Sequence, residues 1–443
     1  MKILVIGSGA REHAIVVALR RDPQVEQVHA APGNPGIAQL ATCHDVPEGV
    51  EDGPAVAALA RRLEVDLVVI GPEAPLVAGV ADDVRAAGIA CFGPSAPAAR
   101  LEGSKAFAKE VMAAADVPTA QAHVCTDLGQ VMDALDAFGA PYVVKDDGLA
   151  AGKGVVVTDN RAQALAHAAQ CLERQVPPGA PAPQIVIEEF LDGPEISLFC
   201  VTDGTTVRAM APAQDFKRLG DGDAGPNTGG MGAYSPLPWA PEGLVEEVVS
   251  RIAEPTVREL ALRGTPFVGI LYVGLALTGR GPRVVEFNAR FGDPETQVVL
   301  ERLRTPLGTL LHAAATGSLA DIGELTWHDR AAVTVVLAAN GYPEGPRRGD
   351  PITGLEAVSE PAYVLHAGTR RVNAPETDGE GGDLLSHGGR VLSVVAPGED
   401  LGQARERVYE ALAHIGLRGS QYRRDIAQAA AAGEIATPGR MAP

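Results

Sequence analysis

The stretch VIGSGAREHA, residues 5–14, joins a short apolar run to a segment whose apolar residues recur at helical spacing. Residues 2–7 predict a strand and residues 10–21 predict a helix, so the glycines occupy a strand-to-helix turn. Backbone N–H groups at the start of such a helix favour an anion, typically a phosphate. The turn therefore predicts an α/β domain with a candidate phosphate-binding loop after its first strand.

The turn departs from the dinucleotide fingerprint G-x-G-x-x-G, because Glu12 follows where the third glycine is needed. The tip of the second strand carries Pro32, Gly33 and Asn34, where a dinucleotide site needs an acid for the ribose hydroxyls. Arg11 and Glu12 in the first helical turn suit a small phosphorylated sugar better than NAD. An NAD-dependent dehydrogenase stays open as an alternative, and so does a turn that binds nothing.

Length and charge limit the possible functions. A chain of 443 residues is too long for one core and predicts two to four domains. A net charge of −19 opposes binding to nucleic acid or to an anionic membrane. The five scattered cysteines contain no C-x-x-C pair, which indicates a reducing, cytoplasmic location and no structural zinc. The sequence shows no signal peptide and no apolar run that could cross a bilayer.

The order of the predicted elements indicates a multidomain protein of α/β and α+β class. Strands and helices alternate over residues 1–103, which predicts a doubly wound parallel sheet. Its loops 7–12, 32–34 and 71–76 follow strands, and ligands of such sheets bind at that edge, so we expect one crevice to collect them. We expect a second domain over residues 104–325 with a flap at about 122–192. A strand-rich C-terminal domain over 328–424 and a tail over 425–443 complete the prediction.

The stretch VVKDDGLAAGKGVVV, residues 143–157, is a strand, a glycine-rich loop and a second strand. This pattern predicts a hairpin flap whose backbone N–H groups can close over phosphates. It is not a Walker loop, because Gly148 and Gly152 enclose three residues and Lys153 precedes Gly154. A solvated surface hairpin is the alternative.

The stretch VVEFNARFGDPETQ, residues 284–297, contains a candidate metal site. Glu286 and Asn288 are two apart on a predicted strand, so both side chains leave the same face. Mg²⁺ typically takes one or two protein oxygens and completes its shell with phosphates and water. Arg290 and Asp293 follow directly. Solvated polar residues at a strand edge would give the same pattern.

Two further stretches carry candidate binding groups. In AQDFKRLGDGDAGPNTGGMGAYSP, residues 213–236, the charged residues that follow an apolar strand are Asp215, Lys217 and Arg218. A loop of this length is usually functional or disordered. In IVIEEFLDGPEIS, residues 185–197, a strand end that could read adenine and ribose carries Glu188, Glu189, Phe190, Leu191 and Glu195. A charged strand end without a ligand is the alternative.

The order of nine motifs resembles the phosphoribosylamine-glycine ligase family of ATP-grasp enzymes, which act in purine biosynthesis. They are VIGSGAREHA, APGN, GPEAPLV, GPSAPAARLEGSKAF, DGLAAGKGV, VIEEFLDG, QDFKR, GPNTGGMGAYSP and EFNARFGDPETQ. The resemblance extends from residue 1 to about residue 424. It implies an ATP-grasp domain with a mobile flap and the ligation of glycine to 5-phosphoribosylamine through glycyl phosphate. A nucleotide-sensing module without catalysis is the alternative outside enzymology.

The resemblance also assigns roles to residues. ATP would contact Lys105, Lys145, Gly148, Gly152, Lys153, Gly154, Glu188, Glu189, Phe190, Leu191 and Glu195. Mg²⁺ or Mn²⁺ would bind Glu286 and Asn288, and catalysis would involve Asp215, Lys217, Arg290 and Asp293. The sugar phosphate would contact Gly9, Arg11, Glu12, Gly33, Asn34 and Glu73. The partners are then small molecules, glycine and 5-phosphoribosylamine, and we expect a monomer.

One residue departs from the family pattern K-A-D-G. This chain has Lys145-Asp146-Asp147-Gly148, which adds a carboxylate beside a lysine that is expected to bind phosphate. Because neighbouring side chains on a strand point to opposite faces, we expect Asp146 to face away from Lys145.

Overall fold

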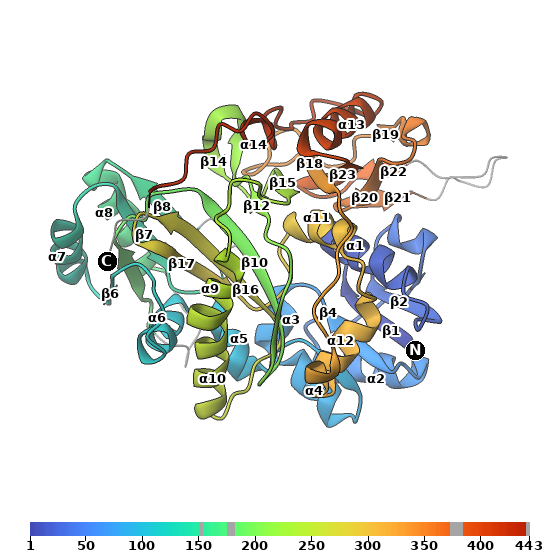
Figure 1. The fold of residues 1–443 in the computed structure, drawn as a ribbon, viewed down its shortest axis with the longest axis horizontal. Helices are drawn as coiled ribbons and strands as arrows, with labels where there is room; N and C mark the ends of the chain where they lie inside the picture. The colour runs from blue at the N-terminus through green and yellow to red at the C-terminus, as the bar shows by residue number, and fades with distance from the viewer. Residues whose placement is uncertain (150–153, 175–181, 373–383, 440–443) are drawn as a thin grey trace.

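The computed structural model describes residues 1–149, 154–174, 182–372 and 384–439. In Figure 1 the N-terminal sheet lies on the right, a long antiparallel sheet in the centre and a smaller sheet on the left. A C-terminal sheet lies above them. The prediction of a multidomain α/β and α+β protein is confirmed.

The N-terminal sheet is parallel, in the order β3-β2-β1-β4-β5. Its strands are β1 Lys2–Gly7, β2 Gln27–Pro32, β3 Thr42–Cys43, β4 Leu67–Ile70 and β5 Ala90–Phe92. Strands β1 and β4 are almost wholly apolar and buried, as expected for a parallel sheet covered on both faces. Its helices are α1 Ala10–Arg20, η1 Ile37–Gln39, α2 Gly53–Leu63, α3 Glu73–Ala78, α4 Val80–Ala86 and α5 Ala96–Gly103. The predicted doubly wound domain is confirmed.

The sheet on the left of Figure 1 is antiparallel, in the order β6-β9-β7-β8, and has a small apolar core of its own. Helix α6, Lys105–Ala114, leads into it. Its elements are β6 Ala122–Cys125, α7 Leu128–Phe138, β7 Tyr142–Asp146, β8 Val155–Thr158, α8 Arg161–Leu172 and β9 Ile185–Glu188. Strands β7 and β8 pair antiparallel, which confirms the predicted hairpin.

The central antiparallel sheet has the order β11-β10-β16-β17. Its strands are β10 Glu195–Asp203, β11 Val207–Ala209, β16 Val268–Thr278 and β17 Gly281–Asn288. The segments that connect and follow them are β13 Arg218–Gly220, η2 Asp221–Asp223, β14 Ala224–Asn227, α9 Leu244–Val248, η3 Val249–Ala253, α10 Glu254–Leu262, α11 Glu295–Arg302, α12 Leu307–Ala315 and η4 Leu319–Asp321. Strand β17 ends where the candidate metal residues lie.

The C-terminal sheet includes two strands from the middle of the chain. Its order is β12-β15-β18-β23-β20, and two of its strands, β12 Gln214–Asp215 and β15 Gly232–Ser235, come from the middle of the chain. The other elements are β18 Ala331–Ala338, β19 Ile352–Thr353, η5 Leu355–Ala357, β20 Tyr363–His366, β21 Thr369–Arg371, β22 Leu384–Ser386, β23 Arg390–Gly398, α13 Leu401–Ala413 and β24 Gly416–Leu417. Strand β15 satisfies the hydrogen-bonding edge of β18, so this sheet joins two regions distant in sequence.

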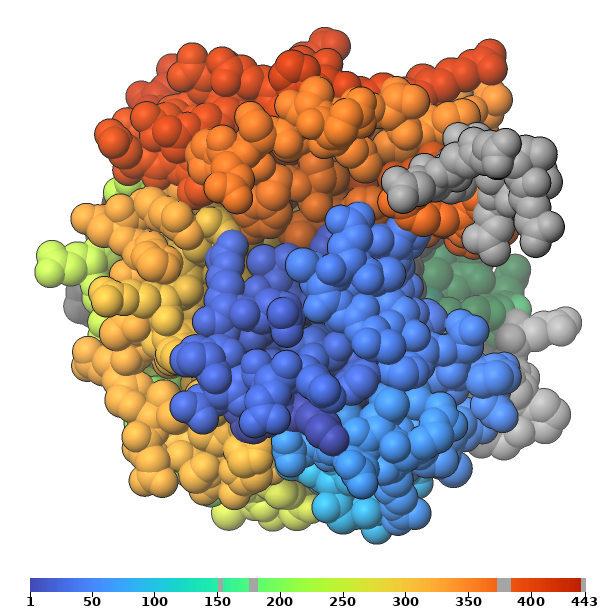
Figure 2. All heavy atoms as spheres, turned by 90° about the vertical axis from the view of Figure 1, so that its right-hand side faces the viewer, coloured from blue at the N-terminus to red at the C-terminus, as the bar shows by residue number. Residues whose placement is uncertain are grey.

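Residues 425–439 follow the C-terminal sheet and pack in part against the core. They include helix α14, Gln428–Ala431, and bury Ile426 and Ala427 against the core. Figure 2 shows the C-terminal part of the chain directly above the N-terminal domain. Among the described residues, no helix is long and apolar enough to cross a membrane.

Candidate active site

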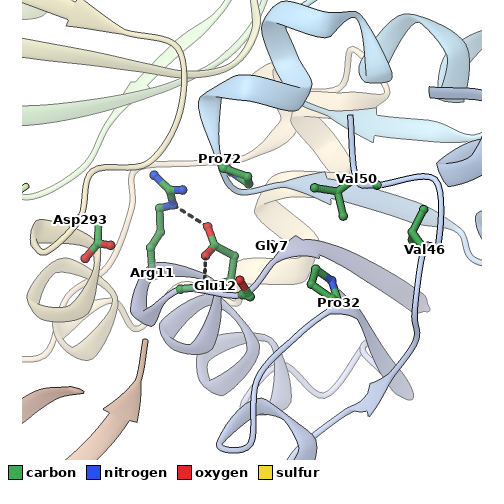
Figure 3. A pocket seen from close by; sticks show the side chains of 11 residues that line it. Gly7, Arg11, Glu12, Pro32, Val46, Val50, Pro72 and Asp293 are labelled. Carbon is green, nitrogen blue, oxygen red and sulfur yellow. Dashed lines mark hydrogen bonds and ion pairs between the residues drawn. The ribbon is translucent and has the colours of Figure 1, made fainter. Parts of the chain in front are cut away.

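A cavity of about 380 Å³ opens at the carboxyl edge of the N-terminal sheet (Figure 3). It collects the loops after β1, β2 and β4, as expected for a doubly wound sheet. The wall consists of Gly7, Ser8, Gly9, Arg11, Glu12, Pro32, Val46, Gly49, Val50, Pro72 and Asp293. The predicted common crevice is therefore present, and Asp293 brings the segment after β17 to it.

Glu12 fills the space that the third glycine of a dinucleotide turn would leave open. Its carboxylate accepts hydrogen bonds from Gly9 N at 2.6 Å and from Arg11 Nε at 2.6 Å. A Cβ on Gly7 would lie 2.5 Å from Glu12 Cγ, and a Cβ on Gly71 would collide with the carboxylate. The Glu12 carboxylate thus occupies the anion position at the start of α1. A dinucleotide pyrophosphate would have to displace it, which counts against the NAD alternative.

Arg11 and Arg290 form a buried charge network between the N-terminal domain and the segment after β17. Arg11 Nη1 donates to Phe291 O at 3.1 Å and lies 4.0 Å from Glu73 Oε2. Arg290 Nε donates to the same Glu73 oxygen at 3.2 Å, and its Nη2 pairs with Glu102 Oε1 at 2.9 Å. Burial would raise the pKa of Glu73, but Arg290 and Arg11 lower it. Glu73 is therefore held between the two guanidinium groups.

Glu102 was not among the candidate residues selected from the sequence, although it lies in the quoted motif GPSAPAARLEGSKAF. It accepts Ala289 N at 2.7 Å, and burial raises its pKa even though Arg290 is adjacent. Burial would lower the pKa of Arg290, but the carboxylates of Glu102 and Glu73 raise it above its usual value. Sequence spacing gave no signal for this pair, because Glu102 and Arg290 are brought together only by the fold.

The Asn34 side chain makes hydrogen bonds to protein groups on several sides. Its Nδ2 donates to Ser8 O and to His366 O, each at 2.9 Å, and its Oδ1 accepts Gly36 N and Ile37 N. All its ordinary hydrogen-bonding positions are thereby used within the protein. Gly33, Asn34 and Glu73 do not belong to the cavity wall, whereas Gly9, Arg11 and Glu12 do.

Glu188 lies in a buried cluster with two lysines. Its Oε2 pairs with Lys145 Nζ at 2.7 Å and its Oε1 with Lys109 Nζ at 2.8 Å. Burial would raise the pKa of Glu188, but Lys145 and Lys109 lower it. Both carboxylate oxygens are thus engaged by lysines, and contact of this side chain with adenosine stays a prediction. Lys109 lies one helical turn after Lys105, but the sequence analysis did not single it out.

The glycine-rich hairpin loop begins beside Lys105, whose Nζ donates to Gly148 O at 3.0 Å. Burial lowers the pKa of Lys105, although Glu286 opposes that shift. At the far end of the loop, Gly154 O accepts Asp146 N at 2.8 Å. Gly152 and Lys153 lie outside the described residues.

Asp146 faces away from Lys145, as strand alternation predicts. One of its oxygens pairs with Arg174 on the other side of β7, whereas Lys145 Nζ donates to Val285 O at 2.9 Å. The second Asp146 oxygen is buried and has no hydrogen-bond partner in the described part of the chain. The extra carboxylate therefore lies outside the cluster of Lys145 and Glu188.

The predicted adenosine segment has one charged and one apolar feature at its surface. Glu189 pairs with Arg280 at 3.1 Å and accepts Gln121 N at 3.1 Å. Phe190 is 45% exposed, and Leu191 is partly buried. An exposed aromatic ring at a strand end offers a flat apolar surface, which suits a purine base.

Asp215 and Lys217 lie in a second cluster, on and beyond β12. Burial raises the pKa of Asp215 to about 7; Lys217 opposes the shift, whereas nearby carboxylates, led by Glu295, add to it. Lys217 pairs with Glu195, and this carboxylate overcomes burial and raises the lysine pKa well above its usual value. Glu195 therefore pairs with Lys217, and its contact with ribose stays a prediction.

Glu295 anchors the floor of this cluster. Its Oε1 accepts Tyr272 OH at 2.7 Å and Ser197 Oγ at 3.1 Å, and all three side chains are buried. None of the three was selected from the sequence, although Glu295 lies within the quoted motif GDPETQ.

Glu286 and Asn288 both lie at the end of β17 and are partly exposed. Burial would raise the pKa of Glu286, but four cations, led by Lys217 and Lys145, lower it. From the described residues, Asn288 Oδ1 receives only a long 3.5 Å contact, from Arg290. Within the described ranges there is no group of three or more His, Cys, Asp or Glu side chains able to hold a metal. A divalent ion here would need phosphate oxygens as well.

Asp293 connects three parts of the molecule. Its Oδ1 accepts Gln297 Nε2 at 2.8 Å, and its Oδ2 pairs with Arg390 Nη2 at 2.9 Å. Arg390 comes from β23 of the C-terminal sheet and was absent from the sequence-based candidates. Its contribution depends on tertiary packing, because 97 residues separate the two side chains in the chain.

Comparison with known proteins gives three consecutive family matches. Residues 1–102, 103–296 and 332–429 match the N domain, the ATP-grasp (A) domain and the C domain of phosphoribosylglycinamide synthetase. The chain is 63% identical to a phosphoribosylamine–glycine ligase of Streptomyces coelicolor, over 97% of this chain and 100% of the relative. It is 58% identical to the enzyme of that name from Mycobacterium tuberculosis, over 98% and 100% of the two chains.

Solved structures show the same architecture. A crystal structure of phosphoribosylamine–glycine ligase from Thermotoga maritima matches with a TM-score of 0.80 and 32% identity, over 96% of this chain and all of that one. The biotin carboxylase domain of a Hydrogenobacter thermophilus 2-oxoglutarate carboxylase, in complex with MgADP and bicarbonate, matches with a TM-score of 0.70. Its identity is 15%, over 95% and 91% of the two chains, so this second match concerns the fold alone.

Proposed function

The chain belongs to the phosphoribosylglycinamide synthetase family, and on that basis we propose that it ligates glycine to 5-phosphoribosylamine. ATP is consumed, and the products are glycinamide ribonucleotide, ADP and phosphate. A carboxylate is a poor electrophile because its charge is delocalised and its leaving group would be oxide. Phosphorylation of glycine supplies a better leaving group, so the reaction passes through glycyl phosphate.

One structural observation supports this proposal. Residues 286–293 form a single segment that runs from the cluster of Lys145 and Lys105 to the cavity assigned to the sugar phosphate. Glu286 interacts with Lys145 and Lys105 at one end of the segment. Asp293 lies in the cavity wall with Arg11 at the other end. An acyl phosphate formed near Glu286 would therefore need to move little to meet an amine bound in the cavity, which favours reaction by proximity.

We assign the phosphate groups of ATP to Lys105, Lys145 and the glycine-rich loop from Gly148 to Gly154. Glu188 has a supporting role in this assignment, because it fixes Lys145 and Lys109. The exposed Phe190 ring, Leu191 and the backbone at Glu189 would contact adenosine. Glu195 would act chiefly through Lys217, with which it pairs.

The residues present fit a divalent ion of the Mg²⁺ or Mn²⁺ type. Glu286 and Asn288 offer hard oxygen donors from one strand, and no ion pair within 4 Å engages the Glu286 carboxylate in the described part of the chain. Two protein oxygens leave most of an octahedral shell to phosphate and water, as Mg²⁺ prefers. When bound, the ion would neutralise phosphate charge at this strand end.

Asp215 and Lys217 are assigned to the transfer itself. Lys217 carries a stable positive charge beside Glu195 and can offset negative charge on the moving phosphoryl group. In the second step the amine nitrogen bonds to the acyl carbon, the carbon–oxygen bond to phosphate breaks, and the nitrogen loses a proton. A carboxyl group with a pKa of about 7, such as Asp215, is suited to accept that proton.

Glycine would lie between Arg290, near its carboxylate, and Asp293, near its ammonium group. The sugar phosphate would occupy the cavity lined by Gly9, Arg11 and Glu12. This cavity would be stabilised by three residues outside its wall, which contact residues of the wall. Gly33 and Asn34 donate hydrogen bonds to Gly7 and Ser8, and Glu73 lies beside Arg11. Activity as a monomer stays a prediction. The five unpaired cysteines support a reducing, cytoplasmic location.

ADP release tests the proposed reaction. We expect ADP only when a divalent metal ion, ATP, glycine and 5-phosphoribosylamine are all present. Each substrate is omitted in turn as a control, and the ligated product is identified by mass spectrometry. ADP release that depends on neither glycine nor 5-phosphoribosylamine would contradict the proposal.

A further inference from the structure

Arg390 reaches out of the C-terminal sheet toward the candidate glycine site. It is the first residue of β23, opposite Ala338 at an irregularity in the strand pairing. Its Nη2 pairs with Asp293 Oδ2 at 2.9 Å, and its Nη1 donates to the backbone oxygen of Asp293, also at 2.9 Å. The Arg390 and Asp293 side chains are 23% and 16% exposed, respectively. The guanidinium therefore grips both the side chain and the backbone of one residue.

The same guanidinium also holds the glycine-rich loop before β15. Arg390 Nη1 donates to Gly229 O, and Gly229 N donates to Tyr342 OH at 3.0 Å. The next residue, Gly230, has a φ of +104°, and a Cβ there would collide with Pro294. The loop is thus enclosed between the C-terminal sheet and the turn that carries Asp293.

These contacts limit how the Asp293 carboxylate can move. Gln297 donates to one oxygen at 2.8 Å and Arg390 donates to the other. A Cβ at Gly9 would lie 3.9 Å from Asp293 Oδ2, so this oxygen borders the cavity. Figure 3 shows Asp293 at the end of the cavity where Arg11 also lies. Without Arg390, the carboxylate could turn toward the guanidinium groups of Arg11 or Arg290.

We propose that Arg390 is a positioning residue of the C-terminal sheet that acts through Asp293 and holds its carboxylate where the ammonium group of glycine binds. This inference rests on the proposed ligase function. It gives the C-terminal sheet an indirect part in glycine binding, because Arg390 acts only through Asp293.

Steady-state kinetics of the full-length enzyme test the inference with Arg390→Ala, Arg390→Lys and the control Arg407→Ala. Arg407 lies on α13 of the same region and donates only to Pro397 O among the described contacts. We expect Arg390→Ala to raise the KM for glycine about ten- to hundredfold, the value of a lost charge-assisted contact, with the KM for ATP within about twofold. Lysine keeps the positive charge but lacks the forked guanidinium group, so Arg390→Lys should raise the KM for glycine less than Arg390→Ala does. Arg407→Ala should leave the KM for glycine unchanged.

A double-mutant comparison with Asp293→Asn separates positioning from a general structural role. If Arg390 acts through Asp293, Arg390→Lys combined with Asp293→Asn should raise the KM for glycine no more than Asp293→Asn alone, within about twofold. The inference would be overturned if the effects of the two substitutions on the KM for glycine multiplied in the double variant. It would also be overturned if the KM for glycine and the KM for ATP changed equally. Because Arg390→Lys retains the cation, the comparison holds even if Arg390→Ala fails to fold. If the wild-type enzyme releases no ADP with both substrates, the proposed function itself fails.

Discussion

Replacing Glu188 by Gln tests the buried cluster that orders the lysines of the nucleotide side. The carboxylate is 4% exposed and pairs with Lys145 at 2.7 Å and Lys109 at 2.8 Å, whose side chains are 6% and 12% exposed. At an effective dielectric constant of about 20, each attraction is worth about 6 kcal/mol before desolvation is subtracted. Removing one partner of a buried pair leaves an uncompensated charge, and the net loss is about 3–5 kcal/mol.

Glu189→Gln is the matched control. Its partner Arg280 is 43% exposed, and such surface pairs contribute about 0–1 kcal/mol. Urea unfolding of wild type, Glu188→Gln and Glu189→Gln, at low salt and at about 0.5 M salt, measures both effects. We expect the loss in Glu188→Gln to persist at high salt, because screening acts weakly on buried charges. Equal stability of the two variants would show that the lysines do not depend on Glu188.

The pH dependence gives a second readout of the same substitution. The pKa of Glu188 is lowered in the folded protein, so its contribution is present above the unfolded pKa and lost as pH falls through the folded value. The stability difference between wild type and Glu188→Gln should therefore shrink toward acid. A difference that stays constant from pH 7 down to the acid unfolding transition would refute the reasoning.

Three further substitutions test other parts of the site. Glu286→Gln keeps the side-chain shape but removes the charge, so ADP release should fall about 10²–10³-fold with folding retained, as judged by circular dichroism. Arg11→Ala should raise the KM for 5-phosphoribosylamine about ten- to hundredfold and leave that for ATP nearly unchanged; a selective rise for ATP would reassign the N-terminal cavity. The pKa of Asp215 is raised to about 7 in the folded protein, so wild type loses stability as pH rises from about 4 to about 7. Asparagine cannot ionise, so the stability of Asp215→Asn relative to wild type should increase over the same interval. Denaturant midpoints of the two proteins at several pH values measure this, and parallel curves would contradict the shift.

The amino-acid sequence was sufficient for local structure and for the relative placement of side chains within one motif. Apolar runs such as residues 2–7 and 67–70 need two covered faces, so they predicted a parallel sheet whose strand ends share one crevice. The spacing of Glu286 and Asn288 placed two oxygen donors on one strand face. Strand alternation also predicted that Asp146 turns away from Lys145, as observed.

Tertiary structure decided which charges meet. Glu188 was expected to contact a nucleotide; the pairing of β7 with β9 brings Lys145 to one of its oxygens, and packing of α6 brings Lys109 to the other. Asn34 was expected to contact a sugar phosphate, yet His366, 332 residues later, takes one of its hydrogen bonds. Arg390 and Glu102 had no local pattern to reveal them, and β12 and β15 joined a sheet formed mostly by residues after 330. The physical reason is that periodicity records which face of an element is buried, whereas an ion pair depends on the relative position of two elements, which only the packed chain defines.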